Sequence, residues 1–139
     1  MIVDDITLIP QYHPEVRKVD LLSGEPTRSL GARYRCTIPE GHKGSCVEEV
    51  VEYVPGHKMT TAFPEDTWGL SRRFGQFVVE TLLDPARNHQ TALKRNAYYD
   101  PIGWTTRLMN LLFLRRLMVR RACKTISGIK RLAELRQTN

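Results

Sequence analysis

Arg115 is the residue whose position most clearly suggests chemistry. At 100° per residue it falls in the middle of an apolar stripe on a predicted helix, with Leu111 and Met118 on either side. A guanidinium buried in such a stripe needs an anion or several acceptors. We therefore expect Arg115 to anchor a ligand carboxylate or enolate. One alternative is an ion pair with an inward-facing strand acid, the candidates being Glu48, Glu49 and Glu80. Another is a surface arginine on a bent helix.

Six further residues are predicted to line the pocket that would hold the ligand of Arg115. Tyr34 lies on the apolar face of its predicted strand and Trp104 begins the predicted helix, so each can offer one polar group to a ligand. The others supply apolar surface: Phe77, Leu108, Leu111 and Met118. Packing in the hydrophobic core is the alternative role for all six.

Other reactive residues do not form a recognisable constellation. Cys36, His42 and Cys46 are close enough in sequence to meet around one hairpin, but their spacing fits no structural zinc pattern. His13, followed by Pro14, could act as an acid or base, although a structural turn is the interpretation we favour. Phosphate-binding, dinucleotide-binding and metalloprotease motifs do not occur. We therefore predict no catalytic residue, no metal and no cofactor.

Six segments in which apolar and polar residues alternate, as in β-strands, would position these side chains. The clearest spans residues 30–38, where Tyr34 and Cys36 alternate with Arg33 and Arg35. The six predicted strands are Arg17–Ser23, Leu30–Ile38, Cys46–Val54, His57–Phe63, Phe74–Leu83 and Gln90–Tyr98. Their spacing favours consecutive antiparallel pairing, and Pro64–Arg73 is expected to be a loop.

One long helix is predicted to follow the strands. Asp100 and Pro101 suit an N-cap and a first helical residue, so the helix is expected over 102–136, bent near Gly128. Strands followed by one amphipathic helix indicate an α+β fold, in which a curved antiparallel sheet of about six strands wraps on a long C-terminal helix. The 139 residues suit a single domain over 1–139.

The positive charge is concentrated in this helix. The net charge is +6, and nine basic residues stand against Glu134 alone between residues 107 and 136. A solvated basic face, contact with an anionic membrane and nucleic-acid binding are the interpretations, and the lack of an aromatic platform disfavours the last. Three cysteines and the absence of a long apolar stretch predict a reduced, cytoplasmic protein.

Several motifs together resemble the SRPBCC group, the START-like polyketide cyclase/dehydrase and lipid-transport superfamily with the helix-grip fold. They are Tyr12-His13-Pro14, Val19–Gly24, Gly31–Arg35 and Glu49–Gly56. Their order, together with the long final helix, extends the resemblance over residues 8–137. It implies a deep, mostly apolar cavity between sheet and helix that binds or transports a hydrophobic small molecule, such as a lipid or polyketide. A polyketide cyclase or dehydratase using that cavity is the alternative, and a membrane- or protein-binding module based on the basic helix is the second.

The resemblance also implies a first strand and a full helix ahead of His13, for which the sequence has little room. We therefore expect the first strand to be missing and one sheet edge to be bare. A homodimer that pairs two such edges is one arrangement that would cover them.

Overall fold

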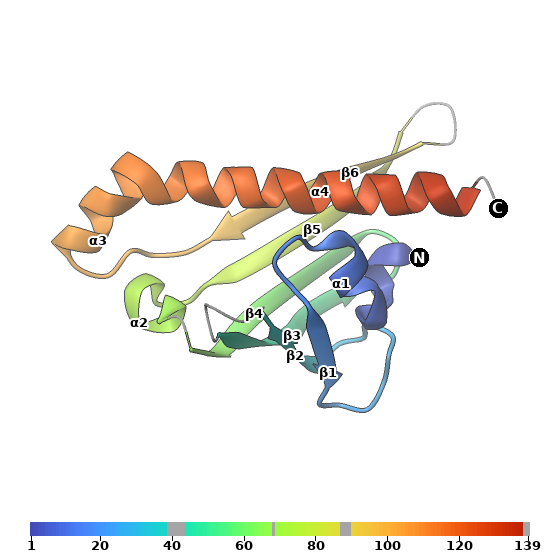
Figure 1. The fold of residues 1–139 in the computed structure, drawn as a ribbon, viewed down its shortest axis with the longest axis horizontal. Helices are drawn as coiled ribbons and strands as arrows, with labels where there is room; N and C mark the ends of the chain where they lie inside the picture. Colours follow the sequence, from blue (N-terminus) through green and yellow to red (C-terminus); the bar gives the residue numbers. More distant parts are fainter. Residues whose placement is uncertain (39–43, 68, 87–89, 138–139) are drawn as a thin grey trace.

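The strands form one antiparallel sheet in chain order. The computed structural model describes residues 1–38, 44–67, 69–86 and 90–137. Within these ranges the strands are β1 (Lys18–Leu21), β2 (Arg33–Thr37), β3 (Ser45–Val54), β4 (Lys58–Asp66), β5 (Val78–Pro85) and β6 (Thr91–Tyr98) (Figure 1). All six predicted strands are confirmed, although several begin or end at different residues.

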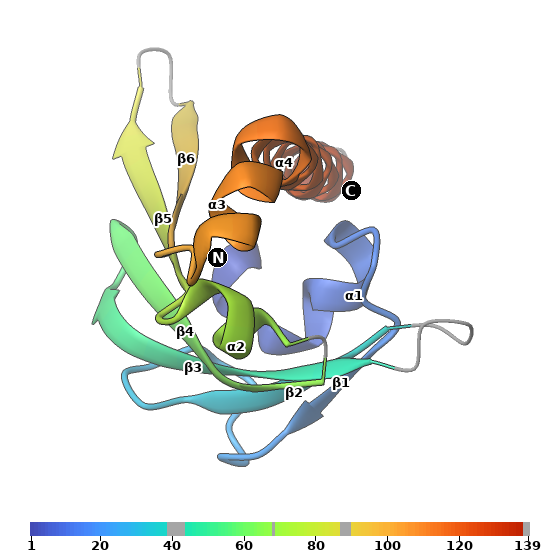
Figure 2. The ribbon, with the colours of Figure 1, turned by 90° about the vertical axis from the view of Figure 1, so that its left-hand side faces the viewer.

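The sheet is strongly curved, and its concave side is filled by helices. The pairing of β3 with β4 is irregular at two places, between Val47 and Glu49 and between Val50 and Glu52, and such bulges bend a strand. Figure 2 shows the sheet curling around α1 and α2, with α4 lying across its open side. The predicted helix-grip architecture is confirmed.

The helical segments flank and follow the sheet. They are η1 (Ile2–Asp4), η2 (Ile6–Leu8), α1 (Ile9–Tyr12), α2 (Leu70–Phe74), α3 (Trp104–Met109), the π-helical turn η3 (Asn110–Leu114) and α4 (Arg115–Gln137). α3, η3 and α4 follow one another without a break as one helical rod. None of the helices in the described residues is long and apolar enough to cross a bilayer.

Two expectations for segments outside the strands are wrong. The expected loop 64–73 is partly regular, because β4 continues to Asp66, whose Oδ2 accepts a hydrogen bond from the Ser71 backbone N–H at 2.9 Å and helps α2 to form. The long helix begins at Trp104 rather than near Pro101. The backbone N–H of Ile102 donates to Arg73 instead, and Gly103 turns the chain with a φ of 78°.

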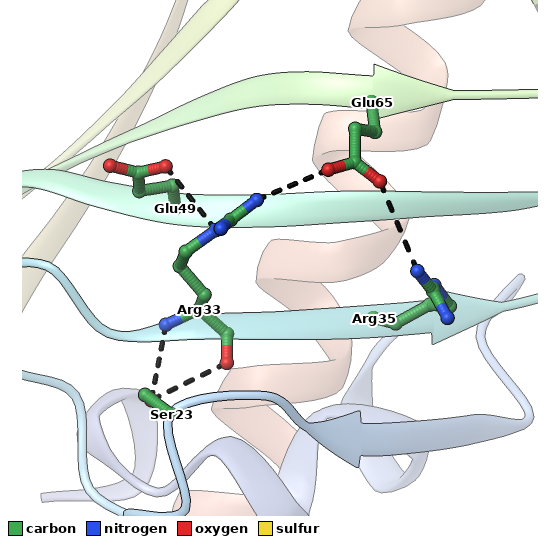
Figure 3. Close-up of polar contacts among 5 residues, drawn as sticks. All are labelled: Ser23, Arg33, Arg35, Glu49 and Glu65. Carbon is green, nitrogen blue, oxygen red and sulfur yellow. Dashed lines mark hydrogen bonds and ion pairs between the residues drawn. The ribbon is translucent and has the colours of Figure 1, made fainter.

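The two faces of β2 carry the residues that the alternation predicted. Tyr34 and Cys36 are buried on the inner face, whereas Arg33 and Arg35 lie on the outer face. There Arg33 Nη2 lies 3.2 Å from Glu65 Oε1, and Arg35 Nη2 lies 3.9 Å from Glu65 Oε2 (Figure 3). This part of the outer face is therefore polar, and the core lies between the inner face and the helices.

The core consists of two clusters joined by α4. The larger one packs the inner face of the sheet against α1, with Ile129 and Leu132 of α4 at its edge. The smaller one surrounds Phe74 and Phe77, with Leu114 and Met118 packed on it. α4 therefore seals the concave side along most of its length.

Gly128 explains how closely α4 approaches α1. α4 is one unbroken helix through this residue, where a bend was expected. A Cβ at position 128 would overlap the carbonyl oxygen of Tyr12. Glycine is thus required here by the contact between two backbones.

Candidate functional site

A cavity lies between α1, the inner face of the sheet and the C-terminal half of α4. Its apolar lining includes Ile9, Leu93 and Ile129. Its polar lining consists of Tyr12, His13, Arg28, Glu48 and Arg95, with Thr61 and Thr81. The cavity has a volume of about 20 Å³, which is room for one or two water molecules. It is therefore narrower and more polar than the resemblance implied.

Arg28 is the buried cation of this site. It comes from the segment between β1 and β2 and is 6% exposed. Its guanidinium donates to the Val3 carbonyl through Nη1, and its Nη2 lies 3.3 Å from the Tyr12 hydroxyl and 3.0 Å from the Tyr34 hydroxyl. Burial alone would lower the pKa of Arg28, but Tyr34, Tyr12 and Glu48 together raise it above its ordinary value. Arg28 therefore remains charged.

Tyr34 connects this cation to a carboxylate. Its hydroxyl accepts from Arg28 and donates to Glu48 Oε2 at 2.8 Å. The other carboxylate oxygen of Glu48 accepts from the Cys36 thiol at 3.4 Å. Burial raises the pKa of Tyr34 well above its ordinary value. The charge of Arg28 opposes this rise, whereas the charge of Glu48 adds to it. Both hydrogen-bonding functions of the Tyr34 hydroxyl are thus used within the protein.

Tyr12 differs from Tyr34 in this respect. Its hydroxyl accepts from Arg28, and none of the residues that the structure describes accepts its proton. Burial raises the pKa of Tyr12, although Arg28 opposes this, so the hydroxyl keeps that proton at neutral pH. Because Tyr12 lines the cavity, its O–H is a donor for a molecule inside it.

His13 and Arg95 add two more donors at the same cavity. The Nδ1 atom of His13 accepts from the backbone N–H of Glu15 at 3.3 Å, which leaves the proton of the neutral ring on Nε2. Burial lowers the pKa of His13 and the charge of Arg95 lowers it further, so this ring is neutral near pH 7. The side chain of Arg95, in β6, has neither a hydrogen bond nor an ion pair among the described residues. Three donors therefore face one small space, which suits a carbonyl, enolate or carboxylate.

Most of the predicted ligand-binding residues lie elsewhere. The expectation that Arg115 is buried is wrong, because it is exposed, as are Trp104, Leu108 and Leu111. Phe77 and Met118 pack in the smaller core cluster and do not line the cavity. Tyr34 is completely buried beside the cavity, where it orients Glu48. Of the three acids named as partners for Arg115, Glu48 alone lines the cavity.

The π-helical turn explains why the helical wheel placed Leu111 on the wrong face. The backbone N–H of Arg115 donates to the carbonyl of Asn110, five residues earlier, and this widened turn contains one more residue than an α-helical turn. Residues before it are rotated relative to α4. Asn110 consequently faces inward and accepts from the Tyr99 hydroxyl at 2.8 Å, while Leu111 is exposed.

Sequence reasoning missed Arg28 and Arg95 because no pattern marks them. Arg28 lies between two strands, where no periodic pattern reports burial, and Arg95 sits in an edge strand of mixed character. Tyr12 and His13 were visible as part of a motif, but their hydrogen-bonding roles depend on Arg28. Of the three residues whose spacing was compared with zinc patterns, Cys36 faces Cys46 across β2 and β3, whereas His42 lies outside the described residues.

Comparisons with known proteins agree with this architecture. A family model described as polyketide cyclase / dehydrase and lipid transport matches residues 1–134. TTHA0849 from Thermus thermophilus superposes with a TM-score of 0.67 at 17% identity, over 94% of this chain and 83% of that protein. A START superfamily protein from Mycobacterium smegmatis gives 0.62 at 17% identity, covering 94% and 86%.

A plant protein shows the same fold. Ginseng major latex-like protein 151 from Panax ginseng superposes with a TM-score of 0.57 at 19% identity, over 79% of this chain and 76% of that one. At these identities the likeness concerns the fold alone. No curated protein sequence matches the chain.

Proposed function

The chain belongs to the polyketide cyclase / dehydrase and lipid transport family, and on this premise we propose that it binds or carries a hydrophobic small molecule, lipid- or polyketide-like, between the sheet and α4. The observation that carries the proposal is the convergence of three hydrogen-bond donors on one cavity that is lined in part by apolar side chains: Tyr12, His13 and Arg95.

The arrangement of the lining predicts how such a ligand is oriented. A carboxylate, enolate or carbonyl oxygen is placed against the guanidinium of Arg95 and the Tyr12 hydroxyl, because charged donors hold anions most strongly. The apolar part lies along Ile9, Leu93 and Ile129, where removal of its surface from water supplies most of the affinity. Glu48 repels an anion on its own side of the cavity and so favours this orientation.

A ligand of more than a few atoms fits only if the residues that line the cavity move apart. The cavity of about 20 Å³ accepts the polar head alone, so the chain must separate Leu93 of β6 from Ile129 of α4. We therefore expect Leu93→Ala to tighten the binding of a long chain by creating space in advance.

Calorimetric titration with decanoate and decan-1-ol tests the proposal, since the two probes share a chain length and differ in the head group. We expect decanoate to bind more tightly. Arg95→Met should weaken decanoate by about 10- to 100-fold, the effect of losing a charged hydrogen bond, and should leave decan-1-ol unchanged. Arg115→Met, which removes an exposed arginine, is the matched control. Equal affinities for both probes would refute the anionic anchor, and binding of neither would refute the carrier function.

A second candidate function is supported by the polar character of the cavity. A cyclase or dehydratase acts by proton transfer and enolate stabilisation. The cavity offers donors for an enolate oxygen, with His13 and the Glu48 carboxylate available for proton transfer. The carrier remains our first proposal because both oxygens of Glu48 already accept hydrogen bonds, from Tyr34 and Cys36.

An exchange experiment separates the two functions. NMR spectroscopy in D₂O follows the replacement of the α-protons of an alkyl β-diketone by deuterium. An enzyme accelerates this exchange, and Glu48→Gln or His13→Gln abolishes the acceleration while the diketone still binds. A carrier binds the diketone and leaves its exchange rate at that of buffer.

A further inference from the structure

The helical rod after the sheet exposes an unusual number of large apolar side chains. Trp104 is 77% exposed, Leu111 73% and Phe113 67%. Five more large apolar residues of the same segment are exposed: Leu108, Met109, Leu112, Leu117 and Val119. Single exposed apolar residues are ordinary, but a group of them on one continuous segment marks an interaction surface.

The same segment is strongly basic. Residues 104–124 include six basic residues and no acidic one. Arg121 is paired with Glu15 at 3.0 Å, and Arg107 donates to the Pro101 carbonyl. The remaining four have no ion-pair partner in the described part of the chain: Arg115, Arg116, Arg120 and Lys124. The natural partner of this surface must therefore be apolar and anionic together.

A second copy of the chain fits this requirement poorly. Two such surfaces facing each other would bring like charges together. Three acids of the outer sheet face are already paired within the chain: Glu49 and Glu65 with Arg33, and Glu52 with Lys58. The complementary chemistry is instead that of an anionic lipid surface, where an apolar layer lies directly beneath phosphate groups.

The position of the surface allows such contact. In Figure 1, α3 and the beginning of α4 form the end of the molecule opposite the two chain termini. The cavity lies toward the other half of α4, at Ile129. The segment can therefore meet a flat surface without obstruction by the N-terminal helices.

We propose that residues 104–124 form a docking surface for an anionic membrane. Trp104 and Phe113 enter the boundary between head groups and acyl chains, a depth that aromatic side chains prefer. The four unpaired basic residues contact lipid phosphates, and each increases membrane partitioning by about fivefold. This surface stands on its own residues and does not depend on the ligand of the cavity.

Vesicle co-sedimentation without added ligand tests this docking surface. We expect binding to vesicles of phosphatidylcholine mixed with phosphatidylserine, weak binding to phosphatidylcholine alone, and release by salt. The double variant Arg116→Gln/Arg120→Gln should lose about 25-fold in partitioning, and Trp104→Ser/Phe113→Ser should lose at least about tenfold. Leu30→Ser, at a residue 70% exposed on another loop, and Arg131→Gln, farther along α4, are matched controls and should bind as wild type does.

Two sets of results would overturn the proposal. One is the absence of binding to either vesicle, or binding that ignores lipid charge and salt. The other is a wild-type dimer in analytical ultracentrifugation that Trp104→Ser/Phe113→Ser converts to a monomer, since that would assign the surface to self-association. Neither depends on the titrations with decanoate, so the two proposals fail separately.

Discussion

Gly128→Ala provides a direct test of the contact between α4 and α1. In a free helix this substitution stabilises by about 1 kcal/mol, because alanine loses less backbone entropy than glycine. Here the new methyl group would overlap the carbonyl oxygen of Tyr12. That oxygen belongs to the backbone and cannot move aside as a flexible side chain would, so α4 must shift away from α1.

The expected magnitude follows from these two opposing effects. Overpacking in a close contact costs about 1–3 kcal/mol, and a clash with backbone lies in the upper part of that range. After the gain in helix propensity, we expect a net loss of about 1–2 kcal/mol in the free energy of unfolding. For a chain of this length, that lowers Tm by about 3–7 °C.

Thermal and urea unfolding followed by circular dichroism measure this effect. Ser127→Ala is the matched control, since Ser127 is exposed at the neighbouring position of the same helix and should gain up to about 0.5 kcal/mol. A Gly128→Ala protein as stable as wild type, or more stable, would refute the close backbone contact.

Three further predictions concern the interior and the outer face. Arg28→Met should lower the free energy of unfolding by about 3 kcal/mol or more, because it leaves the Tyr34–Glu48 pair without its cation; a loss below about 1 kcal/mol in urea unfolding would contradict this. His13 has a lowered pKa in the folded protein, so below about pH 6.5 the unfolded chain takes up a proton that the folded chain resists. The contribution of His13 to the free energy of unfolding is therefore fully present above that pH and is lost as the pH decreases. His13→Gln should reduce this dependence when urea midpoints near pH 7 and pH 5 are compared, and an unchanged dependence would exclude His13 as its source. Glu65→Ala on the outer face should cost no more than about 1 kcal/mol, and a larger loss in the same unfolding assay would show that its ion pairs are stronger than exposed pairs usually are.

The sequence was informative wherever a regular period decides burial. The alternation around Tyr34 identified the inner face of β2, and the six strands were found in order. The long C-terminal helix was also predicted, and its Ile129 and Leu132 pack on the core. In these regions each side chain's surroundings follow from backbone geometry, which is repeated along the element.

The site itself depends on residues that no period governs. Arg28 is buried because its guanidinium meets the Val3 carbonyl and two tyrosine hydroxyls, which come from segments far apart in the sequence. Tyr12 becomes a free donor because Arg28 occupies its oxygen. Such contacts exist once the sheet has curved around α1, and no local sequence pattern specifies them.

The π-helical turn links the wrong expectation for Leu111 to the docking surface. With ideal α-helical winding, Leu111 falls on the stripe that faces the sheet, but it is exposed. Burying a leucine or phenylalanine side chain is worth about 1.5–3 kcal/mol, so a fold that leaves Leu111 and Phe113 in water forgoes several kcal/mol of stability. A helix wound without the extra residue could bury part of this surface. The chain instead places Asn110 toward Tyr99 and turns large apolar groups outward. The simplest explanation is that those groups meet an apolar phase outside the protein.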